Sequence, residues 1–325
     1  MSGAILHRIG LDGACVSIRL DAGRTAEITR RAGPSEWQIM PLAVDPHVHL
    51  DKSFIWPCAR PATPGLFPAI AVTQADTQFW DAADLRARGK PALQEALDAG
   101  VTALRGHLDW GEPETPLAWE VLGDLGDDWH GRVTMHRAPL VSTDALGDGA
   151  MGPGIAAHVA ATGDGVLGAI LYRHAGYPEK LARIFGLAAD HGLRLDFNVD
   201  EGLEPEAQGF DEIVRLTEAD GMAGRVLFGH ACPLSVGPAD GVARLMDAAA
   251  HAGVALYVQP TTNLRLQAIT TDAARAVGLD APKTERGARA DFLLVKGRDW
   301  FETQRRPLAS RIFRDGQVSK DNPCP

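Results

Sequence analysis

The sequence predicts an α/β fold: a (β/α)8 barrel of the TIM type, with a small composite β-sandwich built from both ends of the chain. Three observations lead to this prediction. From about residue 41, short apolar runs alternate with amphipathic helical stretches, and glycine stands at several joints between them. No G-x-G-x-x-G pattern follows any of the runs, which favours a parallel barrel over an open, doubly wound sheet.

Seven apolar runs are predicted to be barrel strands, and each has a helical stretch beside it. In chain order the runs are PLAVDPH, VTALRGHLD, RVTMHRAPL, VLGAILYR, LRLDFNVDEG, RVLFGHACPL and VALYVQPTTN. The joints DAGVTAL, DHGLRL and HAGVAL each place a glycine where a helix ends and a strand begins, which is the C-cap that such units need.

The two ends of the chain have a different character. Residues 1–40 alternate polar and apolar side chains in short runs broken by Gly and Pro, and ADFLLVKG and SRIFRDGQVS near the other end are similar. We therefore predict one composite β-sandwich domain from residues 1–40 and 288–325, with neighbouring strands from both ends. The barrel domain is predicted to span residues 41–287.

Composition places the chain among soluble globular proteins. Of its 325 residues, 45% are apolar, and 32 basic side chains against 42 acidic ones give a formal net charge of -10. This balance, without a basic cluster, argues against nucleic acid or an anionic membrane as a partner. The absence of a leader-like start and of any membrane-length apolar run predicts a cytoplasmic protein.

The four cysteines are far apart in the sequence. Cys15, Cys58, Cys232 and Cys324 lack C-x-x-C spacing, so neither a disulfide framework nor a thiolate metal site is indicated.

Two histidines follow the first predicted barrel strand, in AVDPHVHLDK. His47 and His49 are two residues apart, so both side chains can point to the same side of a strand and share one metal ion. Imidazole nitrogen suits Zn²⁺ or Fe²⁺, and an open coordination position would let the ion acidify a water molecule. We therefore predict one divalent metal ion, Zn or Fe.

Further polar residues stand at the ends of other strands, where barrel active sites form. The second strand ends in His107 and Asp109, which could contact a ligand, support a metal ligand or lie in a solvated loop. The fifth strand ends in Asn198, Asp200 and Glu201, and the sixth in His230.

The ordered motifs resemble those of the amidohydrolase superfamily, in its cytosine deaminase branch. The motifs are PHVHLDKS, GVTALRGHLD, LDFNVDEG, GRVLFGHA and the closing AARAVGL and GARADFLLVKG, which together cover nearly the whole chain. The HLDKS variant is also similar to the branch member that hydrolyses isopropylammelide. The resemblance implies a metal-dependent barrel that hydrolyses C–N bonds on nitrogen heterocycles.

Carried over residue by residue, the resemblance makes His47 and His49 metal ligands, Glu201 the proton shuttle and His230 the group that orients water or polarises the substrate. A carboxylate suits proton transfer, and an imidazole can donate a hydrogen bond to developing negative charge. Asn198 stands where the family has a histidine ligand, and its amide oxygen is a weaker ligand for these metals.

Two further positions depart from the family pattern. Leu140, at the end of the third strand, takes the place of a glutamine that reads the pyrimidine edge, so cytosine itself is not the favoured substrate. The chain also runs from the seventh strand through Gln267 and Ala268 directly into AITTDAARAVGL, without the eighth strand and its aspartate ligand. We predict that a β/α unit is omitted at this join, either disordered or deleted.

The sequence thus predicts a hydrolytic deaminase of a small heterocycle, such as a cytosine-like pyrimidine or a triazine, which uses a metal-bound hydroxide. A homo-oligomer is expected, with His107, Asp109 and Leu140 as substrate-binding candidates. Two alternatives remain open: an amidohydrolase of a cyclic amide or an N-substituted ring amine, and a catalytically inactive barrel that serves as a binding scaffold.

Overall fold

The computed structural model describes residues 3–63, 66–162, 164–172, 175–201, 209–235, 237–257, 284–296 and 310–322. The chain divides into two compact units. The first contains Met1–Asp45, Ala96–Ala103 and Leu264–Pro325, and the second contains Pro46–Glu95 and Leu104–Asn263. The join between Gln267 and Ala268, where a missing segment was predicted, lies outside the described residues.

The first unit contains one seven-stranded sheet in the order β14-β13-β12-β4-β1-β2-β3. Its strands are β1 (Ile5–Leu11), β2 (Ala14–Asp21), β3 (Arg24–Arg30), β4 (Trp37–Pro41), β12 (Phe292–Lys296), β13 (Ser310–Arg314) and β14 (Gln317–Asn322). β12 pairs with β4 in antiparallel register, Leu294 opposite Ile39. Strands from the first 41 residues and from beyond residue 291 therefore lie side by side in one sheet.

Two-residue turns set the register of three hairpins in this sheet. Asp12 and Gly13 join β1 to β2, with φ angles of 48° and 75°. Positive φ at both central positions is the geometry whose twist matches a hairpin, and Asp-Gly is a preferred sequence for it. The same geometry recurs at Ala22–Gly23 and Asp315–Gly316.

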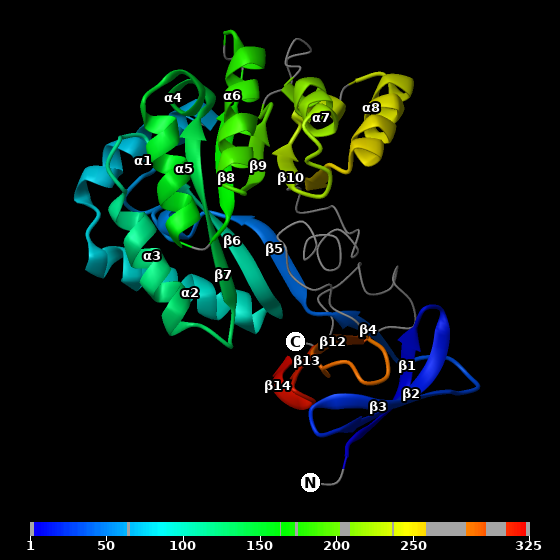
Figure 1. Cartoon of the computed structure of the whole chain (residues 1–325). Helices are drawn as coiled ribbons and strands as arrows, with labels where there is room; N and C mark the ends of the chain where they lie inside the picture. Colours follow the sequence, from blue (N-terminus) through cyan, green and yellow to red (C-terminus); the bar gives the residue numbers. More distant parts are fainter. Residues whose placement is uncertain are drawn as a thin grey trace. The chain divides into compact units, whose positions relative to one another are not determined.

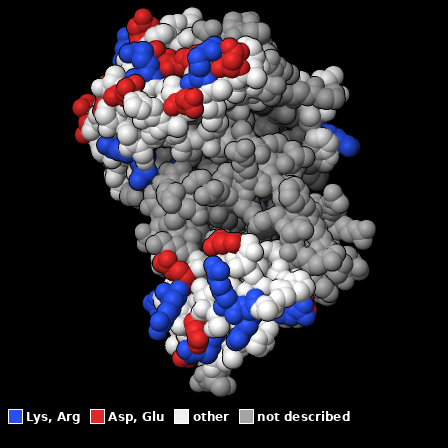
Figure 2. Space-filling model, turned by 90° about the vertical axis from the view of Figure 1, so that its right-hand side faces the viewer, with Lys and Arg blue, Asp and Glu red and all other residues white. Residues whose placement is uncertain are grey.

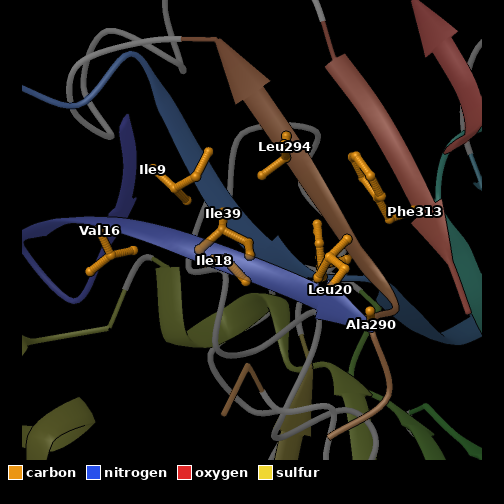
Figure 3. Close-up of a cluster of buried hydrophobic side chains, with 9 residues drawn as sticks. Ile9, Val16, Ile18, Leu20, Ile39, Ala290, Leu294 and Phe313 are labelled. Carbon is orange, nitrogen blue, oxygen red and sulfur yellow. The ribbon is translucent and has the colours of Figure 1, made fainter. Parts of the chain in front are cut away.

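A cluster of apolar side chains stabilises this sheet. Ile18 of β2 is fully buried in this cluster, which includes side chains from both ends of the chain (Figure 3). Burying a large aliphatic side chain contributes roughly 1.5–3 kcal/mol. The buried members are Ile9, Val16, Ile18, Leu20, Ile39, Ala290, Phe292, Leu294 and Phe313.

The second sheet is a row of seven strands in the order β11-β10-β9-β8-β7-β6-β5. They are β5 (Ala43–Val48), β6 (Val101–Asp109), β7 (Thr134–Ser142), β8 (Val166–Leu171), β9 (Arg194–Val199), β10 (Val226–His230) and β11 (Ala255–Tyr257). All seven predicted barrel strands are therefore present. The pairings from β7 to β11 are parallel, and the row forms a nearly closed barrel.

Helices cover the outer side of this row (Figure 1). They are α1 (Leu66–Asp76), α2 (Ala82–Asp98), α3 (Leu117–Asp128), α4 (Thr143–Asp148), α5 (Met151–Thr162), α6 (Tyr177–Asp190), α7 (Gly209–Ala219) and α8 (Ala239–Ala252). Short 3-10 turns occur at η1 (Leu50–Lys52), η2 (Thr77–Phe79) and η3 (Cys232–Ser235).

Amphipathic periodicity determines which helix faces pack inwards. Phe185 of α6 stacks on Phe197 of β9, and Phe210 of α7 meets Phe228 of β10 edge to face. Alternate residues of β9 therefore point to opposite sides: Phe197 faces a helix, and Asp196 and Asn198 face the interior of the row. The polar residues at the strand ends are thus directed to a common interior.

No helix in the described part of the chain is long and apolar enough to cross a membrane. On the face shown in Figure 2, basic and acidic side chains of the described residues are intermixed.

Candidate active site

His47 and His49 face one another at the end of β5. Their Nε2 atoms lie 3.1 Å apart, and the rings are nearly perpendicular, with an interplanar angle of 84°. Two nitrogen ligands of one tetrahedral ion, each about 2.0–2.1 Å from it, would lie about 3.3 Å apart. The spacing of the two nitrogens therefore fits two ligands of a single metal ion.

The other ring nitrogens of this pair are held by neighbours. Nδ1 of His49 donates a hydrogen bond to the carbonyl oxygen of His107, at 3.1 Å. Nδ1 of His47 lies 2.5 Å from the hydroxyl of Tyr257 on β11. A hydrogen bond at the second nitrogen orients a ligating imidazole and fixes its tautomer. With the proton on Nδ1, neutral His49 directs the lone pair of Nε2 towards His47.

Both imidazoles favour the neutral form that binds a metal. Burial, followed by the charge of Lys52 and of His107, lowers the pKa of His49 to about 3. The pKa of His47, which is 5% exposed, is lowered even further, mainly by burial and by the neighbouring imidazoles. Neither ring therefore needs to lose a proton before it binds a cation near neutral pH.

Two more imidazoles surround His47. The ring centroid of His107 lies 3.9 Å from that of His47, and the centroid of His230 lies 5.3 Å from it. His107 is fully buried and precedes Asp109 on the same face of β6. The structure therefore brings His47, His49, His107 and His230 together at the strand ends.

Glu201 and His230 form a close pair beside this cluster. Oε1 of Glu201 lies 2.8 Å from Nε2 of His230, and their side chains are 22% and 13% exposed. Strand alternation alone would direct His230 to the helix side with Phe228, but His230 has a left-handed φ of 72°. Asp200, directly before Glu201, is also left-handed, with φ of 52°. Such strained backbone concentrates at functional sites, and here it ends both strands and redirects their last side chains.

Asn198 occupies the interior of β9 and is 3% exposed. Its Oδ1 atom is buried without a hydrogen-bond partner. A buried carbonyl oxygen without a partner is costly unless something binds it, and a cation would do so. Across the described residues, however, no group of three or more His, Cys, Asp or Glu side chains could hold a metal ion. His47 and His49 thus fit as two ligands, and the unpartnered amide oxygen of Asn198 is a candidate for a third.

The remaining predicted site residues lie at the same strand ends. Leu140 of β7 is 7% exposed. It has the opposite parity to Arg137, which pairs with Asp164 and packs over Trp119 of α3, so Leu140 faces the interior. Asp109 ends β6 and accepts a hydrogen bond from Lys52 Nζ at 2.7 Å.

Sequence reasoning missed Tyr257, which reaches His47 because of a glycine. Gly229 on β10 lies opposite Tyr257 in the ladder, and a Cβ at residue 229 would fall 2.0 Å from Cζ of the tyrosine. Only glycine leaves room for the ring to cross β10. The sequence VALYVQ carries no signal for this role, because a tyrosine in a strand is ordinarily a packing residue.

An ion pair inside the barrel was also missed. NH1 of Arg105 lies 2.5 Å from Oδ2 of Asp196, and both side chains are almost completely buried. The same oxygen lies 3.4 Å from Nε2 of His107. Burial alone would raise the pKa of Asp196, but His107 and Arg105 outweigh it and hold this pKa below the ordinary value. Asp196 thus contacts both Arg105 and the imidazole of His107 inside the barrel.

Two other carboxyl groups near the site have raised pKa values. Burial raises the pKa of Asp51, which is 1% exposed, to about 7, although the charge of Lys52 opposes the rise. Burial likewise raises the pKa of Asp200 to about 6, against hydrogen bonds from the backbone of Phe210 and Gly209.

The fold is similar to that of two solved enzymes. The structure of 5-methylcytosine deaminase from Klebsiella pneumoniae has a TM-score of 0.79 and 17% sequence identity, covering 99% of this chain and 98% of that one. N-isopropylammelide isopropylaminohydrolase from Burkholderia multivorans has a TM-score of 0.73 and 21% identity, covering 98% of each chain. These similarities confirm the α/β barrel that the sequence predicts.

A pterin deaminase from Rhizobium rhizogenes is similar in sequence. It is 28% identical over 251 residues, which is 76% of this chain and 57% of the relative. The chain thus spans little more than half the length of that protein. No family model matches the chain.

Proposed function

We propose that this chain is a metal-dependent hydrolytic deaminase that exchanges an amino group on a small nitrogen heterocycle for oxygen. The observation that carries the proposal is the convergence of His47 and His49 Nε2, 3.1 Å apart, beside the Glu201–His230 pair. The similarity to a pterin deaminase favours a pterin-like ring over cytosine or a triazine.

His47 and His49 would hold the ion, with Asn198 as a weaker third ligand. Either Zn²⁺ or Fe²⁺ suits imidazole donors, and the bound ion would lower the pKa of a water molecule towards neutrality. The remaining chemistry belongs to the protein. Glu201 accepts a proton from the attacking water and delivers it to the leaving amine, which departs as ammonia. His230 donates a hydrogen bond to negative charge that develops at the attacked carbon.

The proposed domain division assigns residues 41–287 to this catalytic barrel and residues 1–40 with 288–325 to an accessory β domain. The pairing of β12 with β4 supports this division. A homo-oligomer is also part of the proposal, and four exposed aromatic side chains between η1 and the end of η2 are candidates for its interface. Phe54, Trp56, Phe67 and Phe79 are 51%, 58%, 62% and 74% exposed. Light scattering of the purified chain tests that expectation.

The activity is tested by ammonia release from pterin, cytosine and isopropylammelide, with the full chain supplied with Zn²⁺ or Fe²⁺. We expect pterin turnover, and a loss of about 100-fold or more in Glu201→Gln with metal content unchanged. Glu218→Gln is the matched control, because among the described residues its carboxylate meets only exposed His251, at 4.0 Å. Unchanged turnover in Glu201→Gln would remove Glu201 from the mechanism.

An inactive scaffold is the second candidate. It is favoured by Asn198 at a ligand position and by the shortage of ionisable ligands among the described residues. Metal analysis separates the two proposals, since a scaffold has no need to retain an ion. A release of amine from isopropylammelide, without release of ammonia from any ring, would instead favour hydrolysis of an N-substituted ring amine.

A further inference from the structure

Lys52 and Asp109 come from two different segments that both adjoin His49. Lys52 ends the η1 turn that begins directly after His49, and its backbone nitrogen donates to the His49 carbonyl at 3.1 Å. Asp109 is the last residue of β6, two residues beyond His107, whose own carbonyl accepts the hydrogen bond from His49 Nδ1. Both side chains therefore belong to the edge of the proposed active site.

The two side chains form an ion pair that keeps unused hydrogen-bonding capacity. Nζ of Lys52 lies 2.7 Å from Oδ1 of Asp109, and the side chains are 21% and 38% exposed. An ammonium group has three donor protons, and a carboxylate has acceptor sites on both oxygens. Among the described residues, Lys52 Nζ makes no other hydrogen bond, and Oδ2 of Asp109 makes none. A donor and an acceptor thus remain side by side and open to a ligand.

We propose that the Lys52–Asp109 pair binds the lactam edge of the substrate ring, meaning a ring carbonyl beside a ring N–H. Lys52 donates to the carbonyl oxygen, and Asp109 accepts from the N–H. This inference rests on the proposed deaminase function and narrows its substrates to oxo-heterocycles. Rings that carry an amino group in place of this carbonyl cannot accept the hydrogen bond, and they bind less tightly.

The test is a fluorescence binding titration of the full chain with two probes, pterin and 2,4-diaminopteridine, which lacks the ring carbonyl. We expect Lys52→Met to weaken pterin binding by about 10- to 100-fold, because a hydrogen bond to a charged group is lost. Its effect on 2,4-diaminopteridine should stay below about threefold. Lys180→Met is the control, since Lys180 also pairs with an aspartate, Asp144, at 2.5 Å on helices α6 and α4.

Asp109→Asn is the second variant, in case Lys52→Met does not fold. The amide oxygen of the introduced asparagine can still accept a hydrogen bond from Lys52, but the negative charge that faces the ring N–H is lost. We therefore expect the ratio of the affinity for pterin to the affinity for 2,4-diaminopteridine to fall by about tenfold. Equal weakening of both probes, or of neither, in a folded variant overturns the lactam proposal and leaves the deaminase proposal standing. Failure of the wild-type chain to bind pterin, cytosine or isopropylammelide overturns both.

Discussion

Removing one charge of the buried Arg105–Asp196 pair should destabilise the barrel strongly. Both side chains are at most 1% exposed, and their atoms lie 2.5 Å apart. Asp196→Asn leaves the guanidinium of Arg105 buried without a counter-charge. Breaking such a pair by removing one partner costs about 3–5 kcal/mol, a large part of the roughly 5–15 kcal/mol that stabilises a typical domain.

The Arg105–Asp196 pair also leaves several of its polar atoms without hydrogen-bond partners. Nε and NH2 of Arg105 and Oδ1 of Asp196 are buried without hydrogen-bond partners. A buried pair with unsatisfied atoms stabilises little relative to apolar side chains of similar size. The double variant Arg105→Met/Asp196→Leu should therefore recover most of the stability that Asp196→Asn loses.

Urea unfolding followed by circular dichroism measures both effects, with Arg244→Met as the control, because Arg244 forms an exposed pair with Asp240. The pKa of Asp196 is lowered in the folded state, so its contribution is present above the unfolded value near 4 and is lost as pH falls through the folded value. The wild-type advantage over Asp196→Asn should accordingly shrink below about pH 4. A loss below about 1 kcal/mol in Asp196→Asn at pH 7 would refute the reasoning.

Three further changes test other parts of the molecule. Tyr257→Phe removes the hydroxyl that orients His47, so metal affinity measured by chelator competition should fall about 10- to 100-fold; an unchanged affinity would exclude that role. Gly229→Ala places a Cβ against the Tyr257 ring and should cost about 1–3 kcal/mol in urea unfolding, whereas Gly186→Ala, with open space in α6, should be neutral or stabilising. Ile18→Ala in the buried cluster of the first unit should cost about 2–5 kcal/mol, and a loss under 1 kcal/mol would contradict that cluster's role.

The sequence predicted the strands better than the helices, for a physical reason. Strand runs such as VTALRGHLD are apolar and end in polar residues, and β6 spans the predicted residues in full. Helix α5 (Met151–Thr162) was not predicted, because its small apolar residues and three breakers, Gly152, Pro153 and Gly154, give no amphipathic period. Helix α6, with its buried face of Leu181, Ile184, Phe185 and Ala188, shows the pattern that α5 lacks.

The sequence likewise predicts some features of the candidate site and not others. The pairing of His47 with His49 follows from strand periodicity, which needs only local sequence. The position of His230 does not, because a left-handed φ reverses the direction that alternation would give it. Tyr257 and Asp196 act on residues that are 210 and 91 positions away in the chain, His47 and Arg105, and no local pattern indicates such partners.

The contact between Tyr257 and His47 links the closure of the barrel to the proposed metal site. β5 and β11 are the two ends of the strand row, and this buried contact joins a side chain from each. The same contact holds the His47 ring at Nδ1, while Nε2 faces His49. One interaction thus serves both the packing of the end strands and the orientation of a ligand. A ligand that binds only the folded state stabilises it in proportion to its occupancy, so an ion held by His47 and His49 should also stabilise the approach of β11 to β5.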